Sequence, residues 1–359
     1  MIIKHIKNYL IFILIFLLSG CSSLPENEII PASYSSNEKI LEVHFLDVGQ
    51  ADCSLIKLPT GESILIDGGN RDDKDYILSY LSKEGVKDIK LVVATHPHED
   101  HIGSLRDVLN NIKVDKIILP TIDADSLVYT NLLYSIEENE VEEVRILGQS
   151  SFDIGEATFK ILSPIKEYSD KNNSSIVIKM IYGETSFLFT GDIEKEAEKD
   201  ILETGVDIRA DVLKVPHHGS KTSSTEEFLG AVSPQISVIQ VGINNEYGMP
   251  VDEILERIKT ITIGRVYRTD ENGEIIIFSD GKSIEAVCGF EEIRDKIVEE
   301  NNTVNTNVVE EKNYIGNINS KVYHALNCNS LPKEENQISF LGKEEAEKNG
   351  YSGHKTCIK

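Results

Sequence analysis

The pattern of apolar and polar positions predicts short strands and amphipathic helices between residues 40 and 288. Apolar runs indicate strands at residues 40–47, 53–58, 63–67, 90–94, 116–119, 212–215 and 236–241. Strands 174–181 and 185–190 would form a hairpin around Gly183-Glu184, and another hairpin would turn at Asn272-Gly273. Helical spacing predicts helices at 72–82, 104–110 and 193–202, and one after Pro250. Grouped strands with interspersed helices favour an α/β fold of stacked sheets with helices outside.

Segments of different composition flank this body. Residues 21–39 are rich in Ser, Pro, Asn and Glu and predict a flexible tether. Residues 289–313 are acidic and rich in Asn and Thr, and predict a linker. Residues 314–359 then form a small tail domain, and a length of 359 residues suits one large and one small domain.

Composition narrows the function classes. With 40% hydrophobic and 27% charged residues, the chain is neither a polytopic membrane protein nor wholly disordered. The 60 acidic residues outnumber the 36 Lys and Arg residues, which argues against a general affinity for nucleic acid. Binding through a local basic groove is the alternative. Five cysteines are too few for a disulfide scaffold in a chain of this length.

The N-terminus predicts a targeting segment. Lys4 and Lys7 precede an apolar run at residues 9–18, which is too short to cross a bilayer but suits a signal-peptide core. The run ends in Leu-Ser-Gly before Cys21, and this ending resembles the lipobox of bacterial lipoproteins. The resemblance implies removal of residues 1–20, lipidation of Cys21 and attachment to the extracytoplasmic face of the cell membrane. A plain secretory signal with an incidental cysteine is the alternative.

Histidines carry the argument for chemistry, because seven of the nine fall into three groups. The first group, His96-Pro-His98-Glu-Asp100-His101, directly follows the strand at residues 90–94. Imidazole and carboxylate ligands suit Zn²⁺ and similar divalent ions. His96 and His98 could share one ion, with Asp100 and His101 turned toward a second. The alternative is a polar surface loop.

This motif resembles the signature of the metallo-β-lactamase fold, and other segments agree in order. Residues 65–69 (Leu-Ile-Asp-Gly-Gly) and 189–192 (Phe-Thr-Gly-Asp) match further family motifs. Residues 45–50, 173–175 and 212–220 resemble, more narrowly, the C-terminal hydrolase domain of ComEC-type competence proteins. The resemblance covers about residues 40–288 and implies an αββα sandwich.

The resemblance also implies roles for the site residues. Asp192 bridges two metal ions, which are zinc or, alternatively, manganese or another divalent metal. His217 is the preferred ligand of the second ion, and His218 supports a ligand from behind or contacts substrate, although the roles of the two histidines could be exchanged. Asp100 is a ligand that also orients the nucleophile, and Asp67 holds the His96–His101 loop in place rather than binding metal. Zinc lowers the pKa of bound water to about 7 and so provides hydroxide at neutral pH.

Two departures from the family pattern stand out. Members usually carry Gly-Gln-Gly-Asp near the first strand, and residue 51 here is Ala, which we interpret as a change in a tight turn. No histidine occurs between residues 102 and 216, so one ion would have only His96, His98 and Asp192 as protein ligands. ComEC-type members share this absence.

Candidate substrate contacts follow from the same segments. Asn173 belongs to one of the ComEC-type motifs. Ser220, Lys221 and Thr222 follow the paired histidines, and one cation with two hydroxyls could hold a phosphate. A solvated turn is the equally weighted alternative.

The tail carries the last group of ligands. His324, Cys328, His354 and Cys357 form two pairs that fit one structural tetrahedral zinc site, and a segment this small usually needs such a support. Residues 314–359 resemble the zinc-binding domain of the Ada DNA-repair protein, with His354 in a position where a cysteine is common. A Cys328–Cys357 disulfide is the alternative, and Cys53 and Cys288 are expected to pack in strands.

The sequence therefore predicts a lipid-anchored, metal-dependent hydrolase outside the cytoplasmic membrane. Phosphodiester cleavage is the preferred reaction, with DNA or a cell-envelope polymer as substrate and no evident protein partner. Hydrolysis of a lactone or amide, or a non-catalytic metal-binding surface protein, are the alternatives.

Overall fold

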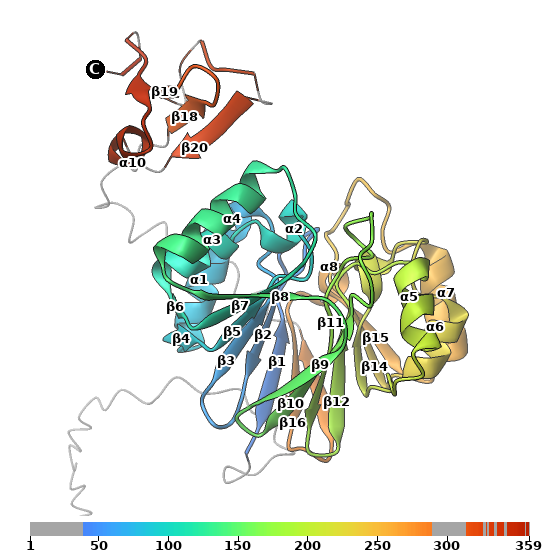
Figure 1. Cartoon of the computed structure of the whole chain (residues 1–359). Helices are drawn as coiled ribbons and strands as arrows, with labels where there is room; N and C mark the ends of the chain where they lie inside the picture. The colour runs from blue at the N-terminus through green and yellow to red at the C-terminus, as the bar shows by residue number, and fades with distance from the viewer. Residues whose placement is uncertain are drawn as a thin grey trace, which may run out of the picture.

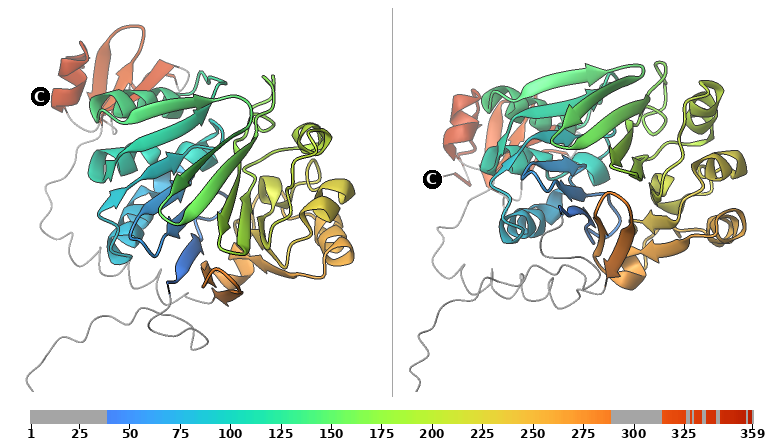
Figure 2. Two further views of the ribbon diagram at one scale, coloured as in Figure 1. Left: turned by 60° about the horizontal axis from the view of Figure 1, so that its bottom comes forward. Right: turned by 90° about the horizontal axis from the view of Figure 1, so that it is seen from below.

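Two β-sheets pack face to face, with helices on both outer surfaces, in the computed structural model of this chain (Figure 1, Figure 2). The structure describes residues 39–288 and, in the tail, 314–359 except 326–327, 329, 334–335, 341–342, 356 and 359. The predicted α/β sandwich is confirmed. The predicted signal segment (1–20), the linker (289–313) and Cys21 lie outside the described residues. Within the described part of the chain, no helix has the length and apolar character needed to cross a membrane.

The first sheet has eight strands and mixes antiparallel with parallel pairing. Its strands, in spatial order, are β17 (Ile284–Cys288), β16 (Ile275–Ser279), β1 (Leu41–Phe45), β2 (Ser54–Lys57), β3 (Ser63–Ile66), β5 (Leu91–Val93), β7 (Lys116–Pro120) and β8 (Glu142–Ile146). The pairs from β17 to β3 are antiparallel, and those from β3 to β8 are parallel. Strands β4 (Asp88–Ile89) and β6 (Lys113–Val114) pair with each other as a separate ribbon, in which β4 contacts β3.

The second sheet has seven strands. In spatial order they are β15 (Arg265–Arg268), β14 (Ile236–Ile239), β13 (Val212–Lys214), β12 (Thr185–Phe189), β11 (Val177–Tyr182), β10 (Ala157–Ser163) and β9 (Ser150–Ile154). The hairpin predicted around Gly183-Glu184 is confirmed as β11 and β12, which pair antiparallel from Ile178 and Phe189 to Tyr182 and Thr185. From β12 to β15 the pairing is parallel.

Helices cover the outer face of each sheet because each presents one apolar stripe. The first sheet is covered by α1 (Lys74–Lys83), α3 (Leu105–Asn111) and α4 (Leu127–Glu138), with the short α2 (Glu99–Ile102) at its edge. The second is covered by α5 (Lys195–Glu203), α6 (Glu226–Val232) and α7 (Asp252–Ile261). Helix α1 shows the principle, since Ile77, Tyr80 and Leu81 are its buried residues. The core between the sheets is a separate apolar cluster that includes Phe45, Phe159 and Phe189.

The predicted hairpin at Asn272-Gly273 is wrong. Strands β15 and β16, on either side of this turn, belong to different sheets, and helix α8 (Thr269–Asn272) makes the crossing. Gly273 provides the left-handed backbone (φ +63°) that ends this helix, so the Asn-Gly pair marks a helix end rather than a two-residue hairpin. The hairpin of β16 and β17 turns instead near Gly281. Helix α4 and strands β8, β9 and β10 were not predicted.

The tail forms its own small sheet. Its strands are β20 (Gln337–Phe340), β18 (Tyr314–Asn317), β19 (Val322–Ala325) and β21 (Ser352–Gly353), in that spatial order, with helix α10 (Lys343–Lys348). Tyr314, Tyr323, Phe340, Ala346 and Tyr351 form its apolar cluster. A cluster of five buried side chains is small for an independent domain, and domains of this size usually need further stabilisation such as a bound metal.

Candidate metal centre

The histidine and aspartate motifs meet where strands of both sheets end. Asp67 follows β3 and His96 follows β5 in the first sheet, while Asp192 follows β12 and His217 follows β13 in the second. Strands β3 and β5 are parallel neighbours, and so are β12 and β13. Parallel neighbours end at the same edge of a sheet, so the loops that follow them lie side by side.

A close contact between loops requires glycine before Asp192. Gly191 has φ +51°, and a Cβ atom added there would lie 2.9 Å from the side chain of Thr95. The backbone N–H of Asp192 donates to the Ser175 hydroxyl at 3.1 Å. The Thr190-Gly191 turn therefore presses the Asp192 loop against the loop that carries His96.

The paired histidines lie in an unusual turn. His217 (φ 49°) and His218 (φ 51°) both adopt left-handed backbone, and Gly219 follows with φ +81°. For two residues with side chains this conformation costs about 1–3 kcal/mol each, so the surrounding structure must hold it. The Ser223 hydroxyl donates to the carbonyl of Pro216 at 3.1 Å, and the N–H of His217 donates to that of Gly191 at 3.2 Å. The turn points both imidazoles at the centre of the site.

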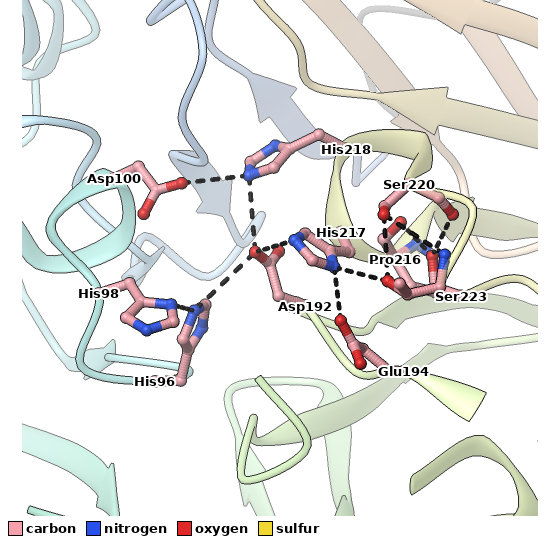
Figure 3. A network of polar contacts seen from close by, with 12 residues as sticks. His96, His98, Asp100, Asp192, Glu194, Pro216, His217, His218, Ser220 and Ser223 are labelled. Atoms are coloured by element: carbon pink, nitrogen blue, oxygen red, sulfur yellow. Dashed lines mark hydrogen bonds and ion pairs between the residues drawn. The ribbon is translucent and has the colours of Figure 1, made fainter. Parts of the chain in front are cut away.

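One carboxylate oxygen lies at the focus of this arrangement. Imidazole Nε2 atoms surround Oδ2 of Asp192 at 3.2 Å (His101), 3.6 Å (His218), 3.8 Å (His217) and 3.9 Å (His96), as Figure 3 shows in part. On one side, Nδ1 of His98 lies 3.0 Å from Nε2 of His96. On the other side, Oδ2 of Asp100 lies 3.3 Å from Nε2 of His218. Two groups of potential ligands thus share Asp192.

Three buried polar atoms at this focus have no hydrogen-bond partner among the described residues. They are Nε2 of His101, Nε2 of His218 and Oδ1 of Asp192. One potential ligand atom from each of Asp100, His101, Asp192 and His218 lies within 4.8 Å of the others. A buried polar atom without a partner is costly, and divalent metal coordination satisfies such atoms. The unpartnered buried atoms and the spacing of these side chains therefore fit a bound metal ion.

The opposite nitrogen of His101, His217 and His218 contacts a protein oxygen. Nδ1 of His101 lies 2.8 Å from Asp67, and Nδ1 of His218 lies 2.9 Å from the carbonyl oxygen of Gln240. Nδ1 of His217 lies 3.2 Å from the Thr222 hydroxyl. Oxygen acceptors at Nδ1 favour the tautomer whose Nε2 lone pair is free for metal.

Asp67 has the contacts expected of a residue that positions the loop. Its carboxylate accepts hydrogen bonds from the backbone N–H of Thr95 at 2.8 Å and from the Thr95 hydroxyl at 2.7 Å. Asp67 itself has φ 60°. Burial raises the pKa of Asp67, although the neighbouring His101 lowers it in part.

Charges in the metal-free centre lower the pKa of Asp192 and raise the pKa of His218. Burial lowers the pKa of His218, but the carboxylates of Asp192 and Asp52 outweigh it and raise this pKa to about 10. The pKa of Asp192 is held well below its usual range, because the positive charges of His101 and His218 outweigh its burial. Burial and the nearby His101 charge lower the pKa of His96 well below its usual range. The carboxylates thus favour positive charge in the centre, which protons or cations supply.

Asp52, Lys214 and Gln240 are part of the centre and were not predicted from the sequence. Asp52 lies 3.3 Å from Nδ1 of His218 and forms a buried ion pair with Lys214. The Gln240 side chain donates to the carbonyls of Leu46 and Cys53 from the other sheet. The Gly-Gln-Ala-Asp segment could have indicated Asp52, because it departs from a family motif. Lys214 and Gln240 lie at the ends of apolar strands, and only the packing of the sheets shows that they belong to the centre.

The predicted substrate contacts have separate surroundings. Oδ1 of Asn173 accepts from the backbone N–H groups of Glu194 and Ala197 at 3.1 Å each, so it caps the start of α5. The Ser220 hydroxyl is buried and lies 3.0 Å from the Thr222 hydroxyl. Lys221 is exposed. These contacts tie Asn173 and Ser220 to the protein, and their role toward substrate stays a prediction.

The sequence profile of the Metallo-beta-lactamase superfamily matches residues 46–242, which include every potential ligand of this centre. The chain belongs to this superfamily. Its members are usually metal-dependent hydrolases, and the predicted family is confirmed.

Curated relatives share the superfamily domain. ComE operon protein 3 of Bacillus subtilis is 32% identical over 252 residues, which are 65% of this chain and 32% of the relative. Recombination protein 2 of Haemophilus influenzae is 33% identical over 226 residues, which are 60% of this chain and 26% of the relative. This chain thus spans about a third or less of these relatives' lengths. The solved metallo-β-lactamase fold protein YhfI from Bacillus subtilis aligns with a TM-score of 0.43 and 13% identity, over 64% of this chain and 96% of that one.

The superfamily departure at residue 51 has a simple structural account. Ala51 is fully buried in the apolar cluster under α1 and α3, and its backbone is not left-handed. The left-handed position of this turn is Gly49 (φ +68°). A methyl group at position 51 is therefore accommodated without backbone strain.

The predicted ligands of the tail also converge. Cys328 Sγ lies 3.4 Å from Nδ1 of His324 and 3.5 Å from Nδ1 of His354. Cys357 Sγ lies 3.3 Å from Nδ1 of His354 and 3.9 Å from Nδ1 of His324. Both cysteines are free, and all four ligand atoms lie within 4.8 Å of one another. Two thiols and two imidazoles in this arrangement suit a tetrahedral zinc ion.

Proposed function

We propose that this protein is a metal-dependent phosphodiesterase. The observation that carries the proposal is the shared Asp192 carboxylate, which faces imidazoles of two ligand groups at 3.2–3.9 Å. Two-metal sites of this kind suit in-line displacement at phosphorus, because they stabilise the attacking and the leaving oxygen together.

His96, His98 and Asp192 are the proposed ligands of one ion, and Asp100, His101, Asp192 and His218 are those of the other. The preference for His218 over His217 rests on burial, since the His218 side chain is 2% exposed and that of His217 is 18% exposed. When bound, zinc or another divalent ion supplies a nucleophile from water at neutral pH and neutralises charge that develops on the phosphate.

The chain's own residues provide positioning and access. The Asp100 side chain is 32% exposed, and its Oδ2 lies 3.3 Å from Nε2 of His218. Asp100 is therefore placed to accept a hydrogen bond from the attacking water. His217, held by Thr222 and Glu194, lines the partly exposed side of the site and is placed to donate to a phosphate oxygen.

Cations near the open side would support an anionic substrate. Lys171 precedes the predicted contact Asn173 by two residues, and the exposed Lys221 follows the paired histidines. Both are candidate partners for the phosphodiester charge.

Two substrate classes are proposed. The competence and recombination names of the relatives support DNA. The net charge of −24 opposes tight binding of a long polyanion, so we expect weak DNA binding, and a phosphodiester in a cell-envelope polymer fits equally well. We further propose that the protein acts outside the cytoplasmic membrane, anchored through a lipid on Cys21.

Hydrolysis assays test the proposal. Purified protein is loaded with zinc or manganese and assayed on bis-(nitrophenyl) phosphate, plasmid DNA and a lactone. We expect chelator-sensitive cleavage of the phosphodiester, which should be lost in Asp192→Asn. Asp153→Asn is the control and should retain activity, because it changes an exposed carboxylate on the edge strand β9. Cleavage of the lactone alone would favour the alternative hydrolase. Metal binding without turnover on any substrate would favour a non-catalytic surface protein.

A further inference from the structure

A fully buried ion pair lies behind the proposed metal ligands. Nζ of Lys214 lies 2.7 Å from Oδ2 of Asp52, and the two side chains are 2% and 5% exposed. Lys214 is the last residue of β13 in the second sheet, and Asp52 lies between β1 and β2 of the first. The pair therefore joins the two sheets at the base of the metal centre.

The backbone of Asp52 touches the ligand loops directly. Its N–H donates to the carbonyl of Asp100 at 3.0 Å, and its carbonyl accepts from the N–H of Gly69 at 2.8 Å. The N–H of Gly68 in turn donates to the carbonyl of His101. Asp52 is thus held at a fixed place relative to both the Asp100 and the His101 side of the site.

The Asp52 carboxylate faces the rear nitrogen of two histidines. Oδ1 lies 3.3 Å from Nδ1 of His218, and Oδ2 lies 3.9 Å from Nδ1 of His101. Oδ1 has no hydrogen-bond partner among the described residues, so its interaction with His218 is electrostatic. A negative charge behind a ligating imidazole makes Nε2 more basic, while the contact of Nδ1 with the Gln240 carbonyl orients the His218 ring.

Lys214 places a positive charge beside this buried carboxylate. Burial of a carboxylate without a partner is costly, and the ammonium group 2.7 Å away offsets that cost. Lys214 also donates to the carbonyl of Val215 at 3.2 Å, which places its charge beside the turn that carries His217 and His218.

We propose that Asp52 and Lys214 form a positioning pair, which holds a negative charge behind His218 and so raises its metal affinity. The inference rests on the proposed metal site but not on the nature of its substrate. It differs from a purely structural role, because a structural pair would matter for folding alone.

Removing the charges singly and together separates the two roles. Asp52→Asn and Lys214→Met each leave one buried charge unpaired, so both should lower the melting temperature of the metal-free protein. The double variant D52N/K214M removes both charges and should recover most of that loss. Lys57→Met serves as the control, because it breaks a partly buried pair with Glu42 and Glu84 away from the ligand loops.

Metal affinity is the deciding measurement, by competition with a chelator for zinc and for manganese in the full chain. We expect affinity to fall about 10–100-fold in Asp52→Asn and to stay low in the double variant despite its recovered stability. Lys57→Met should bind metal as the wild type does. In a His218→Ala background, adding Asp52→Asn should lower the affinity further by only a small part of its effect in the wild type.

Two results would overturn the proposal. One is a double variant that binds metal as tightly as the wild type. The other is an Asp52→Asn effect that is equally large with and without His218. If the wild type binds metal and the variants behave as expected while no phosphodiester is cleaved, the positioning pair stands and the proposed reaction falls.

Discussion

His101 and Asp192 belong to loops of different sheets, yet Nε2 of His101 lies 3.2 Å from Oδ2 of Asp192. His101 is in α2 beyond β5 of the first sheet, and Asp192 follows β12 of the second. The centre therefore exists only when the two sheets are packed in register. Residues that tie the sheets together near this point, such as Gln240, act on the metal centre as well as on stability.

Asp192→Asn should remove metal from both ligand groups. The amide keeps the shape of the side chain but not the charge that attracts two cations, so metal content and turnover should fall together. We expect the loss of phosphodiesterase activity to exceed the about 100-fold that loss of an outer ligand partner costs. Metal content by elemental analysis, compared with Asp153→Asn, checks this. An Asp192→Asn protein that holds two ions and turns over at near-normal rates would refute the shared-carboxylate mechanism.

His218→Ala should lose more metal than His217→Ala. Nε2 of His218 is buried, lacks a hydrogen-bond partner among the described residues, and faces both Asp100 and Asp192 at 3.3 and 3.6 Å. His217 is nearer to solvent, so water can replace it. Zinc titration of both variants should show excess metal restoring turnover in His217→Ala only. The opposite order would return His217 to the ligand set, as the sequence motif first suggested.

Zinc should stabilise the tail. Cys357→Ser removes one of four converging ligands, so the tail should become sensitive to protease and lose hydrogen-exchange protection, as it should on chelation of the wild type. Cys288→Ser, at an exposed and ungrouped cysteine, is the matched control. A tail whose protection is unchanged by both chelator and Cys357→Ser would contradict a zinc site.

His44 should make stability depend on pH. It is buried among Tyr80 at 2.6 Å, Glu42 at 3.1 Å and Glu274 at 3.6 Å, with Glu84 and Lys57 also close to this cluster. Burial lowers the pKa of His44, but Glu274 and Glu42 outweigh it and raise this pKa above its usual 6.5.

A raised pKa means that the protonated form is stabilised by folding. Its contribution is complete below about pH 6.5 and is lost as pH rises through the folded-state pKa. The stability difference between wild type and His44→Gln should therefore be constant below about pH 6.5 and shrink as the pH rises above that value. Denaturant unfolding at several pH values measures it. A difference that is constant, or that grows with pH, would show that His44 is neutral in the folded protein.

Cys21→Ala should release the protein from membranes or block its processing, because the lipid would be attached to this thiol. Fractionation of cells that express each form, with gel mobility as the second measurement, provides the test. Cys288→Ser should stay with the membrane fraction. A Cys21→Ala protein that remains membrane-bound at the mature mobility would contradict the lipoprotein prediction.

The class of fold and the candidate ligand types can be predicted from the sequence alone. Ligand type is a local property of the sequence. The motif therefore predicts a metal site independently of where its loop lies, since it contains His96, His98, Asp100 and His101. Apolar runs and helical stripes likewise indicate stacked sheets with outer helices, because burial follows the period of each element.

Which of these groups lie close together depends on how the two sheets pack. The local sequence Asn272-Gly273 predicts a hairpin, but β15 and β16 belong to different sheets. The pairing of Asp52 with Lys214, and the different burial of His217 and His218, depend on how β1, β2 and β13 pack across the sandwich. Such contacts join residues far apart in the chain, and no local pattern of polarity or propensity encodes them.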